Sequence, residues 1–171
     1  MSENAYKTKR SFVIPLIAIV VLLFLLLLIS LYNGRQWEII ILAVLFIVSL
    51  GWSVETAKRE IVVTDQGLTL QRFFRRKDFV WAEITHLAVM VIKKNVYFLL
   101  TTTRGFYIFS NLLENHVLLI RSLMERLGEE KVEVEVKNYL DHPVERFSLI
   151  VMSWLAVGII VGLILLKVSG I

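Results

Sequence analysis

Long apolar blocks alternate with one polar stretch along this chain. Uncharged runs cover residues 12–31, 39–54 and 147–166, and most polar residues lie between the second and the third run. A helix rises about 1.5 Å per residue, so about 20 apolar residues cross a hydrocarbon core of about 30 Å. The pattern therefore predicts three transmembrane helices at about 12–31, 37–54 and 147–166, the second extended through Trp37 and Glu38.

The first apolar run has to be weighed against a cleaved signal peptide. The apolar core of a signal peptide has about 7–15 residues and precedes a cleavage site of small residues. Here the run is longer, and Leu31-Tyr32-Asn33-Gly34 does not resemble such a site. We therefore expect a retained anchor, joined to the second helix by a turn at Asn33-Gly34.

The polar stretch begins with short segments in which apolar and polar residues alternate. This period of two is typical of half-buried strands. The turn at Asp65-Gln66-Gly67 offers a glycine for positive φ, and Arg75-Arg76-Lys77 suits a hairpin tip. Short connections favour antiparallel pairing, because parallel strands need long crossovers. The predicted strands are Ile61–Thr64, Leu68–Phe73, Phe79–Trp81, Leu87–Ile92, Val96–Thr102 and Phe106–Phe109.

The period then changes to that of an amphipathic helix. Asn111 and Glu114 have the spacing of a capping box, and Gly128 is suited to end the helix. The predicted inward face consists of residues spaced by three and four: Leu113, Val117, Ile120, Met124 and Leu127. This helix is too short and too charged to span a membrane, so we expect it to close the open end of the strand layer.

The chain thus divides into three regions. Residues 1–56 are an N-terminal tail and a transmembrane hairpin, 57–140 a polar domain, and 141–171 the third transmembrane helix with a short tail. Within the domain, 129–137 is acidic with valines at alternate positions. This pattern fits an edge strand or an extended linker equally well.

Composition and charge fit an integral membrane protein of the cytoplasmic membrane. Of the residues, 57% are hydrophobic, against about 45–50% in soluble domains. Lys58, Arg59 and the basic residues after them follow the second run, whereas the first hairpin offers only Arg35. Because cytoplasmic loops are enriched in Lys and Arg, we expect the N-terminus and the domain in the cytoplasm and the C-terminus outside.

The order of motifs in the domain resembles bacterial pleckstrin-homology-like membrane proteins. The motifs are I-V-V-T-D-Q-G-L-T-L from Ile61, R-F-F-R-R-K from Arg72, W-A-E-I from Trp81, and the final amphipathic helix. The resemblance covers about residues 60–128. It implies an α+β fold in which a small antiparallel barrel or sandwich of two sheets is capped by a C-terminal helix. That family fold has one strand more than the six predicted here, and Val132–Val136 or the segment before Ile61 would supply it.

Residue chemistry offers no enzyme site. The chain has no cysteine, and His86, His116 and His142 show no metal-ligand spacing. A structural or solvated role is the better interpretation for each histidine, and Trp81 suits a core position. We predict no catalytic residues, no cofactor and no metal. A net charge of +4 is also small for a nucleic-acid-binding protein.

Two surfaces remain as candidates for binding. Arg72, Arg75, Arg76 and Lys77 could contact anionic lipids, since each basic residue near such a surface gains about 1 kcal/mol. The competing interpretation is a solvated hairpin tip. Gly158 and Gly162 form a G-x-x-x-G pattern that permits close packing against the other two spans or against a second copy.

These observations predict a non-catalytic membrane protein with a pleckstrin-homology-like domain. The resemblance implies that it binds a protein partner or scaffolds a membrane complex, because this fold mostly presents surfaces. The alternatives are a regulator that binds anionic lipids and an accessory subunit of a transporter or membrane enzyme. Expected partners are membrane lipids and either another membrane protein or further copies of the chain.

Overall fold

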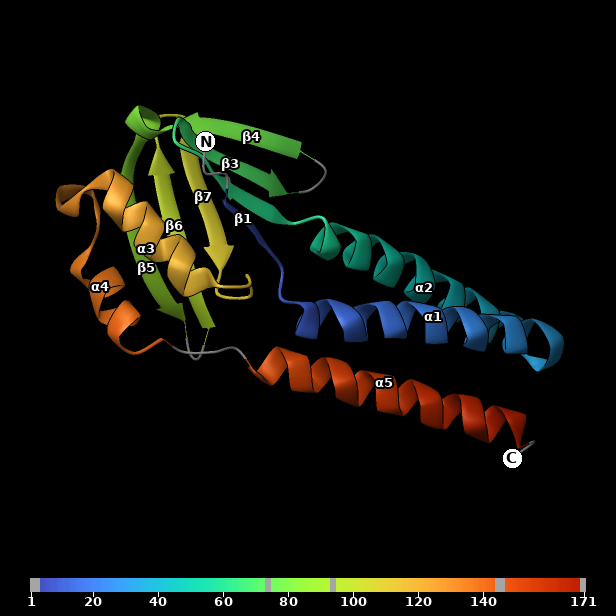
Figure 1. The fold of residues 1–171 in the computed structure, drawn as a ribbon. Coiled ribbons are helices and arrows are strands. Elements are labelled where there is room, and N and C mark those ends of the chain that lie inside the picture. Colours follow the sequence, from blue (N-terminus) through green and yellow to red (C-terminus); the bar gives the residue numbers. More distant parts are fainter. Residues whose placement is uncertain (1–3, 73–74, 93–94, 144–146, 170–171) are drawn as a thin grey trace. The chain divides into compact units, whose positions relative to one another are not determined.

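A computed structural model describes residues 4–72, 75–92, 95–143 and 147–169, and Figure 1 shows their helices and strands. The chain forms two compact units. One combines Met1–Lys9 with Lys58–Arg146, and the other combines Arg10–Ala57 with Phe147–Ile171. The first unit is therefore built from two pieces of chain, and the first helical hairpin is inserted between them.

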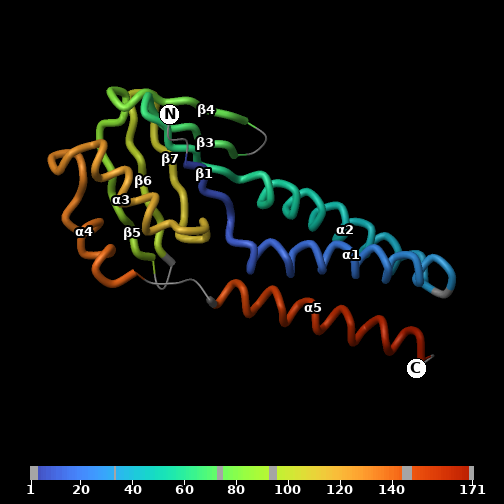
Figure 2. The backbone as a smooth tube through the Cα atoms, viewed as in Figure 1, coloured from blue at the N-terminus to red at the C-terminus, as the bar shows by residue number. Residues whose placement is uncertain are grey.

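The helical unit consists of α1 (Arg10–Asn33), α2 (Gln36–Ala57) and α5 (Phe147–Val168). All three helices are long and apolar enough to cross a membrane, as the hydrophobic runs predicted. Helix α1 contacts both α2 and α5, and Figure 2 shows it between them. Leu23 and Leu26 of α1 pack around Ile160 of α5, while Phe24 lies 5.6 Å from Phe46 of α2 between ring centres.

The other unit contains two antiparallel sheets, with the orders β1-β2-β3-β4 and β5-β6-β7. A 3₁₀ helix at Trp81–Glu83 joins them, and the Trp81 indole donates to the carbonyls of Thr64 and Asp65. The strands are β1 (Asn4–Lys7), β2 (Glu60–Val63), β3 (Gly67–Arg72), β4 (Arg75–Val80), β5 (Ile84–Ile92), β6 (Asn95–Thr102) and β7 (Gly105–Ser110).

Strand β1 was not predicted, because the N-terminal residues read as a polar tail. It pairs with β2 in the register Asn4↔Val63 to Lys7↔Glu60. Tyr6 and Ile61 face each other in this register, and both side chains are buried. The additional strand thus comes from the start of the chain and not from Val132–Val136 or the residues directly before Ile61.

The predicted closing helix exists but begins later than expected. Helix α3 spans His116–Leu127 and ends at Gly128, whose φ of 78° suits glycine. The capping box at Asn111 does not form, because Leu113 is drawn into a backbone bridge with Thr8. The inward face is also rotated from the predicted one, and its buried residues are His116, Leu119, Ile120, Leu123 and Leu127.

Residues 129–137 are neither an edge strand nor a linker. Glu129–Lys131 form a 3₁₀ turn, Val132 makes a single parallel bridge to Leu87, and helix α4 (Val134–Asp141) follows. Val136 and Tyr139 of α4 are buried in the core. Of the three alternate valines, only Val132 pairs with a strand, and Val134 and Val136 belong to α4.

Two turn predictions also need correction. Gly67 does not have positive φ; a Cβ at this position would instead overlap the Phe79 carbonyl oxygen. Glycine is needed there because β3 and β4 approach closely at Gly67↔Val80. Arg75, Arg76 and Lys77 belong to β4 and are not a hairpin tip; the connection at 73–74 lies outside the described residues.

Candidate functional site

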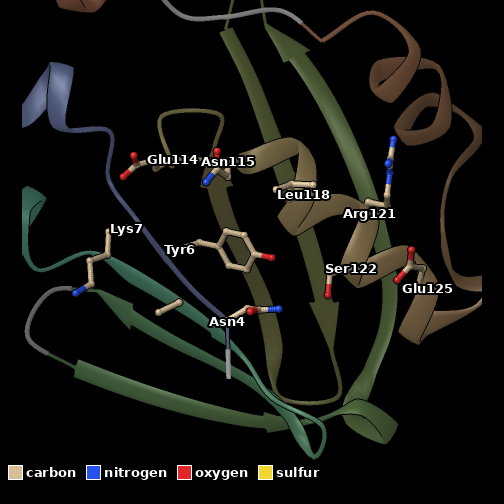
Figure 3. Close-up of a pocket in the computed structure, with 10 residues that line it drawn as sticks. Asn4, Tyr6, Lys7, Glu114, Asn115, Leu118, Arg121, Ser122 and Glu125 are labelled. Atoms are coloured by element: carbon tan, nitrogen blue, oxygen red, sulfur yellow. The ribbon is translucent and has the colours of Figure 1, made fainter. Parts of the chain in front are cut away.

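A groove lies between the edge strand β1 and helix α3, within the sheet-containing unit. Its volume is about 560 Å³. Figure 3 shows Tyr6 projecting from β1 toward α3, with Leu118, Arg121, Ser122 and Glu125 along the helix. Backbone and side chains of Asn4–Lys7, Glu114 and Asn115 complete the lining.

Strand β1 forms one wall of the groove, and its residues differ in burial. Tyr6 and Thr8 are buried, whereas Asn4, Ala5 and Lys7 are exposed. Lys7 lies 3.8 Å from the Glu60 carboxylate of β2 between Nζ and Oε1. Tyr6 and Thr8 thus anchor β1 on the sheet, and pairing with β2 along one edge leaves the other edge of β1 facing the groove.

Part of that edge is already closed by the chain itself. The Lys9 N–H donates to the Leu112 carbonyl at 2.9 Å, and the Glu114 N–H donates to the Lys7 carbonyl at 2.7 Å. Asn115, with a φ of 52°, then turns the chain away from β1 into α3. The covered part of the edge therefore ends at Lys7, and Asn4–Tyr6 line the groove.

Helix α3 forms the other wall with residues spaced by three and four. Leu118, Arg121, Ser122 and Glu125 follow one another on the same helical face. Leu118 is 53% exposed, whereas Leu119 and Ile120 on the opposite face are fully buried. One side of α3 thus completes the core and the other side is left for contacts.

The groove has a mostly polar lining in which charges of both signs are balanced, and Ala5, Tyr6 and Leu118 are its apolar residues. Burial raises the pKa of the Tyr6 phenol above its ordinary value of 10.0. The charged lining residues are Lys7, Arg121, Glu114 and Glu125, two of each sign. This lining suits a zwitterionic or polypeptide ligand better than a phosphate, which favours a cluster of cations.

The four basic residues predicted to contact lipid lie at the other edge of the same sheet, on β3 and β4. The Arg72 guanidinium donates to the Ile108 carbonyl at 3.1 Å, and Arg76 pairs with Asp78 at 3.0 Å. The Lys77 ammonium donates to the Tyr107 hydroxyl and lies 4.8 Å from the centre of that ring. Arg75 has no ion pair or hydrogen bond from its side chain among the described residues. These cations are exposed but largely held against the protein.

Two histidines have partners that the sequence did not suggest. The buried His116 ring is 2.9 Å from the Tyr139 hydroxyl, which links α3 to α4. His86 of β5 lies 3.0 Å from the Glu133 carboxylate. Within the described residues no group of three His, Asp or Glu side chains could hold a metal ion. The first contact joins two helices, and the second joins β5 to the residue that precedes α4.

In the helical unit, one polar contact joins all three helices. The Lys167 ammonium donates to the Ser30 hydroxyl at 2.8 Å and to the Glu38 carboxylate at 3.0 Å. Ser30 is fully buried and lies near the end of the first apolar run, and Lys167 follows the third apolar run. Charged residues at the ends of adjacent apolar runs were the only sequence signal for this contact.

Gly158 and Gly162 are not points of close packing among the described residues. A Cβ at either glycine would have no neighbour within 4 Å outside its own helix. Helix α5 instead meets α1 through Ile160 and Ile164. A contact of these glycines with a second copy of the chain stays a prediction.

The groove itself was not predicted, because it depends on β1. Its helical wall was visible in the sequence as the polar stripe of the amphipathic helix, but nothing local indicated which strand would face it. No family model, curated protein or solved structure matches this chain.

Proposed function

We propose that this chain is a non-catalytic, membrane-anchored module whose pleckstrin-homology-like domain binds a protein partner. The observation that carries this proposal is the groove between β1 and α3, which has an exposed Leu118 beside charges of both signs. The count and order of the strands, with the closing helix α3, support the pleckstrin-homology-like assignment. The Lys and Arg residues after the second apolar run support a cytoplasmic domain.

The groove suits protein binding better than catalysis. Its lining contains no cysteine or histidine, and its single serine, Ser122, has no histidine beside it in the lining. Such a lining lacks the nucleophile and base pair that acyl-transfer sites need. Protein interfaces instead combine apolar contacts with a polar rim, and the exposed Leu118 among charged residues matches that arrangement.

A matched pair of variants tests the proposal in the full-length chain. Leu118→Glu places a charge in the groove, and Val134→Glu places one on α4, where Val134 is 65% exposed. Proteins that co-purify with the wild-type chain in mild detergent should be lost with Leu118→Glu and retained with Val134→Glu. Equal retention by both variants would remove the groove as the binding surface.

A second candidate function is the binding of anionic lipids by β4. Arg75, Arg76 and Lys77 are exposed on this edge strand. Changing all three to Gln in the full-length chain, reconstituted in nanodiscs, should lower the number of bound phosphatidylglycerol molecules counted by native mass spectrometry. The loss should shrink at high salt, because exposed charges are screened beyond about 8 Å at physiological ionic strength. Unchanged lipid binding at low salt argues against this function.

A further inference from the structure

We propose that the groove accepts an extended segment of the partner protein, which adds a strand to the free part of the β1 edge. This inference rests on the proposed protein-binding function and specifies how the partner is held. Peptides that add to a sheet edge are bound through main-chain hydrogen bonds, and side-chain pockets then select their sequence.

The backbone directions along β1 supply the donors and acceptors. The bonds to Leu112 and Glu114 show that Lys7 and Lys9 point their backbone groups away from β2. Backbone groups alternate in direction along a strand, so Ala5 points the same way. The Ala5 N–H and C=O, together with the Lys7 N–H, therefore face the groove, where a partner strand can pair with them.

The chain itself begins the pairing that the partner would continue. Residues Leu112–Glu114 run antiparallel to Lys7–Lys9, with Thr8 opposite Leu113. At Asn115 this segment leaves the edge. An extended segment beside Asn4–Tyr6 would occupy the position that the departing chain vacates.

The opposite wall has a length that matches a short strand. Leu118 to Glu125 spans seven helical steps, or about 10 Å at 1.5 Å per residue. Three residues of extended chain cover about the same distance at roughly 3.3 Å per residue. One strand of three or four residues can therefore touch the whole stripe on α3.

The side chains on α3 indicate the sequence that would fit. A residue beside Tyr6 would place its side chain against Leu118, so we expect an apolar residue there. Arg121 and Glu125 lie further along the stripe, and no ion pair involves either side chain in the described part of the chain. An acidic and a basic side chain flanking the apolar one would complement them.

The test uses the full-length chain in detergent micelles and a defined probe. The probe is a short synthetic peptide of alternating valine and threonine with one glutamate and one lysine, blocked at both ends. Binding should protect the Ala5 and Lys7 amides from hydrogen exchange. The same peptide with N-methyl groups on the amides that would face β1 should bind about tenfold more weakly, the effect of losing one or two backbone hydrogen bonds.

Two variants distinguish loss of backbone pairing with β1 from loss of side-chain contacts in the groove. Ala5→Pro removes an N–H that faces away from β2, a position where an edge strand tolerates proline. It should weaken the peptide about tenfold, as should Leu118→Glu, whereas Val134→Glu should have no effect. If Ala5→Pro unfolds the domain, strand addition is still tested by comparing the unmodified and the N-methylated peptide on the wild-type chain.

Each other outcome overturns a particular statement. If Leu118→Glu abolishes partner binding but N-methylation and Ala5→Pro change nothing, the groove binds protein without strand addition. No binding of the probe, or no protection of Ala5 and Lys7, also rejects strand addition and leaves the proposed function to its own test. If the chain alone is a dimer that Ala5→Pro makes monomeric, the occupant is a second copy and the inference is wrong.

Discussion

Individual polar side chains hold together elements that are distant along this chain. Lys167, Ser30 and Glu38 connect the three helices of the helical unit, and His116 and Tyr139 connect α3 to α4. In the sheet, Asp78 accepts hydrogen bonds from Thr69 and Arg76. Removing one partner of such a contact lowers stability, because the remaining polar group is left without a hydrogen-bond partner.

The Lys167–Glu38 pair should stabilise the helical unit. Glu38→Gln removes the carboxylate from Lys167, and an unpaired ammonium between apolar helices is costly. We expect a lower melting temperature of the detergent-solubilised chain. Exchange of the two charges, with Glu38→Lys and Lys167→Glu together, should give a melting temperature between those of Glu38→Gln and the wild type.

Arg35→Gln serves as the control, because Arg35 lies in the same turn and its backbone N–H, which the substitution keeps, donates to the Glu38 carboxylate. Its effect on the melting temperature should be smaller. Equal effects of Glu38→Gln and Arg35→Gln would mean that the pair contributes nothing specific.

Asp78 should give the stability a dependence on acid pH. The hydrogen bond from Thr69, followed by that from Arg76, holds the pKa of Asp78 below its ordinary value of 3.8. The stability from this carboxylate is therefore present above pH 3.8 and is lost as the pH falls through the lower folded value. Asp78→Asn should destabilise the chain to urea at pH 7 and have less effect near pH 3.

The exposed Asp141 at the end of α4 provides the comparison. Asp141→Asn should change the urea midpoint little at either pH. A difference between wild type and Asp78→Asn that stays constant from pH 7 to pH 3 would show that the Asp78 charge does not stabilise the fold.

At the scale of elements, α3 and β1 have two roles each. The inner face of α3 closes the core over both sheets, and its outer face lines the groove. Strand β1 completes the sheet beside β2 and offers its other edge to the groove. A substitution on one face can therefore change stability while one on the other changes binding.

Ile120 and Leu118 test the two faces of α3. Ile120→Ala should cost about 2–5 kcal/mol of unfolding free energy, because a fully buried side chain leaves a cavity. Leu118→Ala, at a half-exposed position, should stay within about 0.5 kcal/mol. Limited proteolysis in detergent measures both, and equal protease resistance would show that α3 does not close the core.

Strand β1 should be required for the domain in spite of its place at the start of the chain. Tyr6→Asp would bury an unpaired charge beside Ile61, a change that is strongly destabilising. We expect rapid proteolysis of the segment from Lys58 to Arg146. Ala5→Asp, at an exposed position of the same strand, should leave it resistant. Resistance of both variants would mean that β1 is dispensable.

At the scale of the whole molecule, the sheet-containing unit is discontinuous. The hairpin α1–α2 enters it between β1 and β2, and α5 follows it. Both ends of this unit are thus tied to helices that are long and apolar enough to span a membrane.

An orientation in the membrane is predicted from the three apolar helices and the positions of Lys and Arg. We expect the domain in the cytoplasm and the C-terminus outside. Reporter fusions after Gly128 and after Ile171 should therefore report opposite sides of the membrane. Reports from the same side would contradict this topology.

Much of the architecture was predictable because it depends on neighbours along the chain. The three apolar helices follow from run length, and six of the strands follow from the period of two around Leu68, Leu87 and Phe98. The end of α3 at Gly128 follows from a local backbone requirement. Each of these features depends on residues only a few positions apart, so the pattern along the sequence is enough to predict it.

The groove could not be read from the chain, because it depends on contacts between distant residues. Asn4–Lys7 become a strand only because β2, more than fifty residues later, offers an unpaired edge. Leu113 pairs with Thr8, so α3 begins only at His116, and packing against the core selects which face of α3 is buried. Local periodicity did not determine which face of α3 is buried, and it predicted no strand at Asn4–Lys7. Long-range backbone pairing selected one arrangement and, with it, the surface available to a partner.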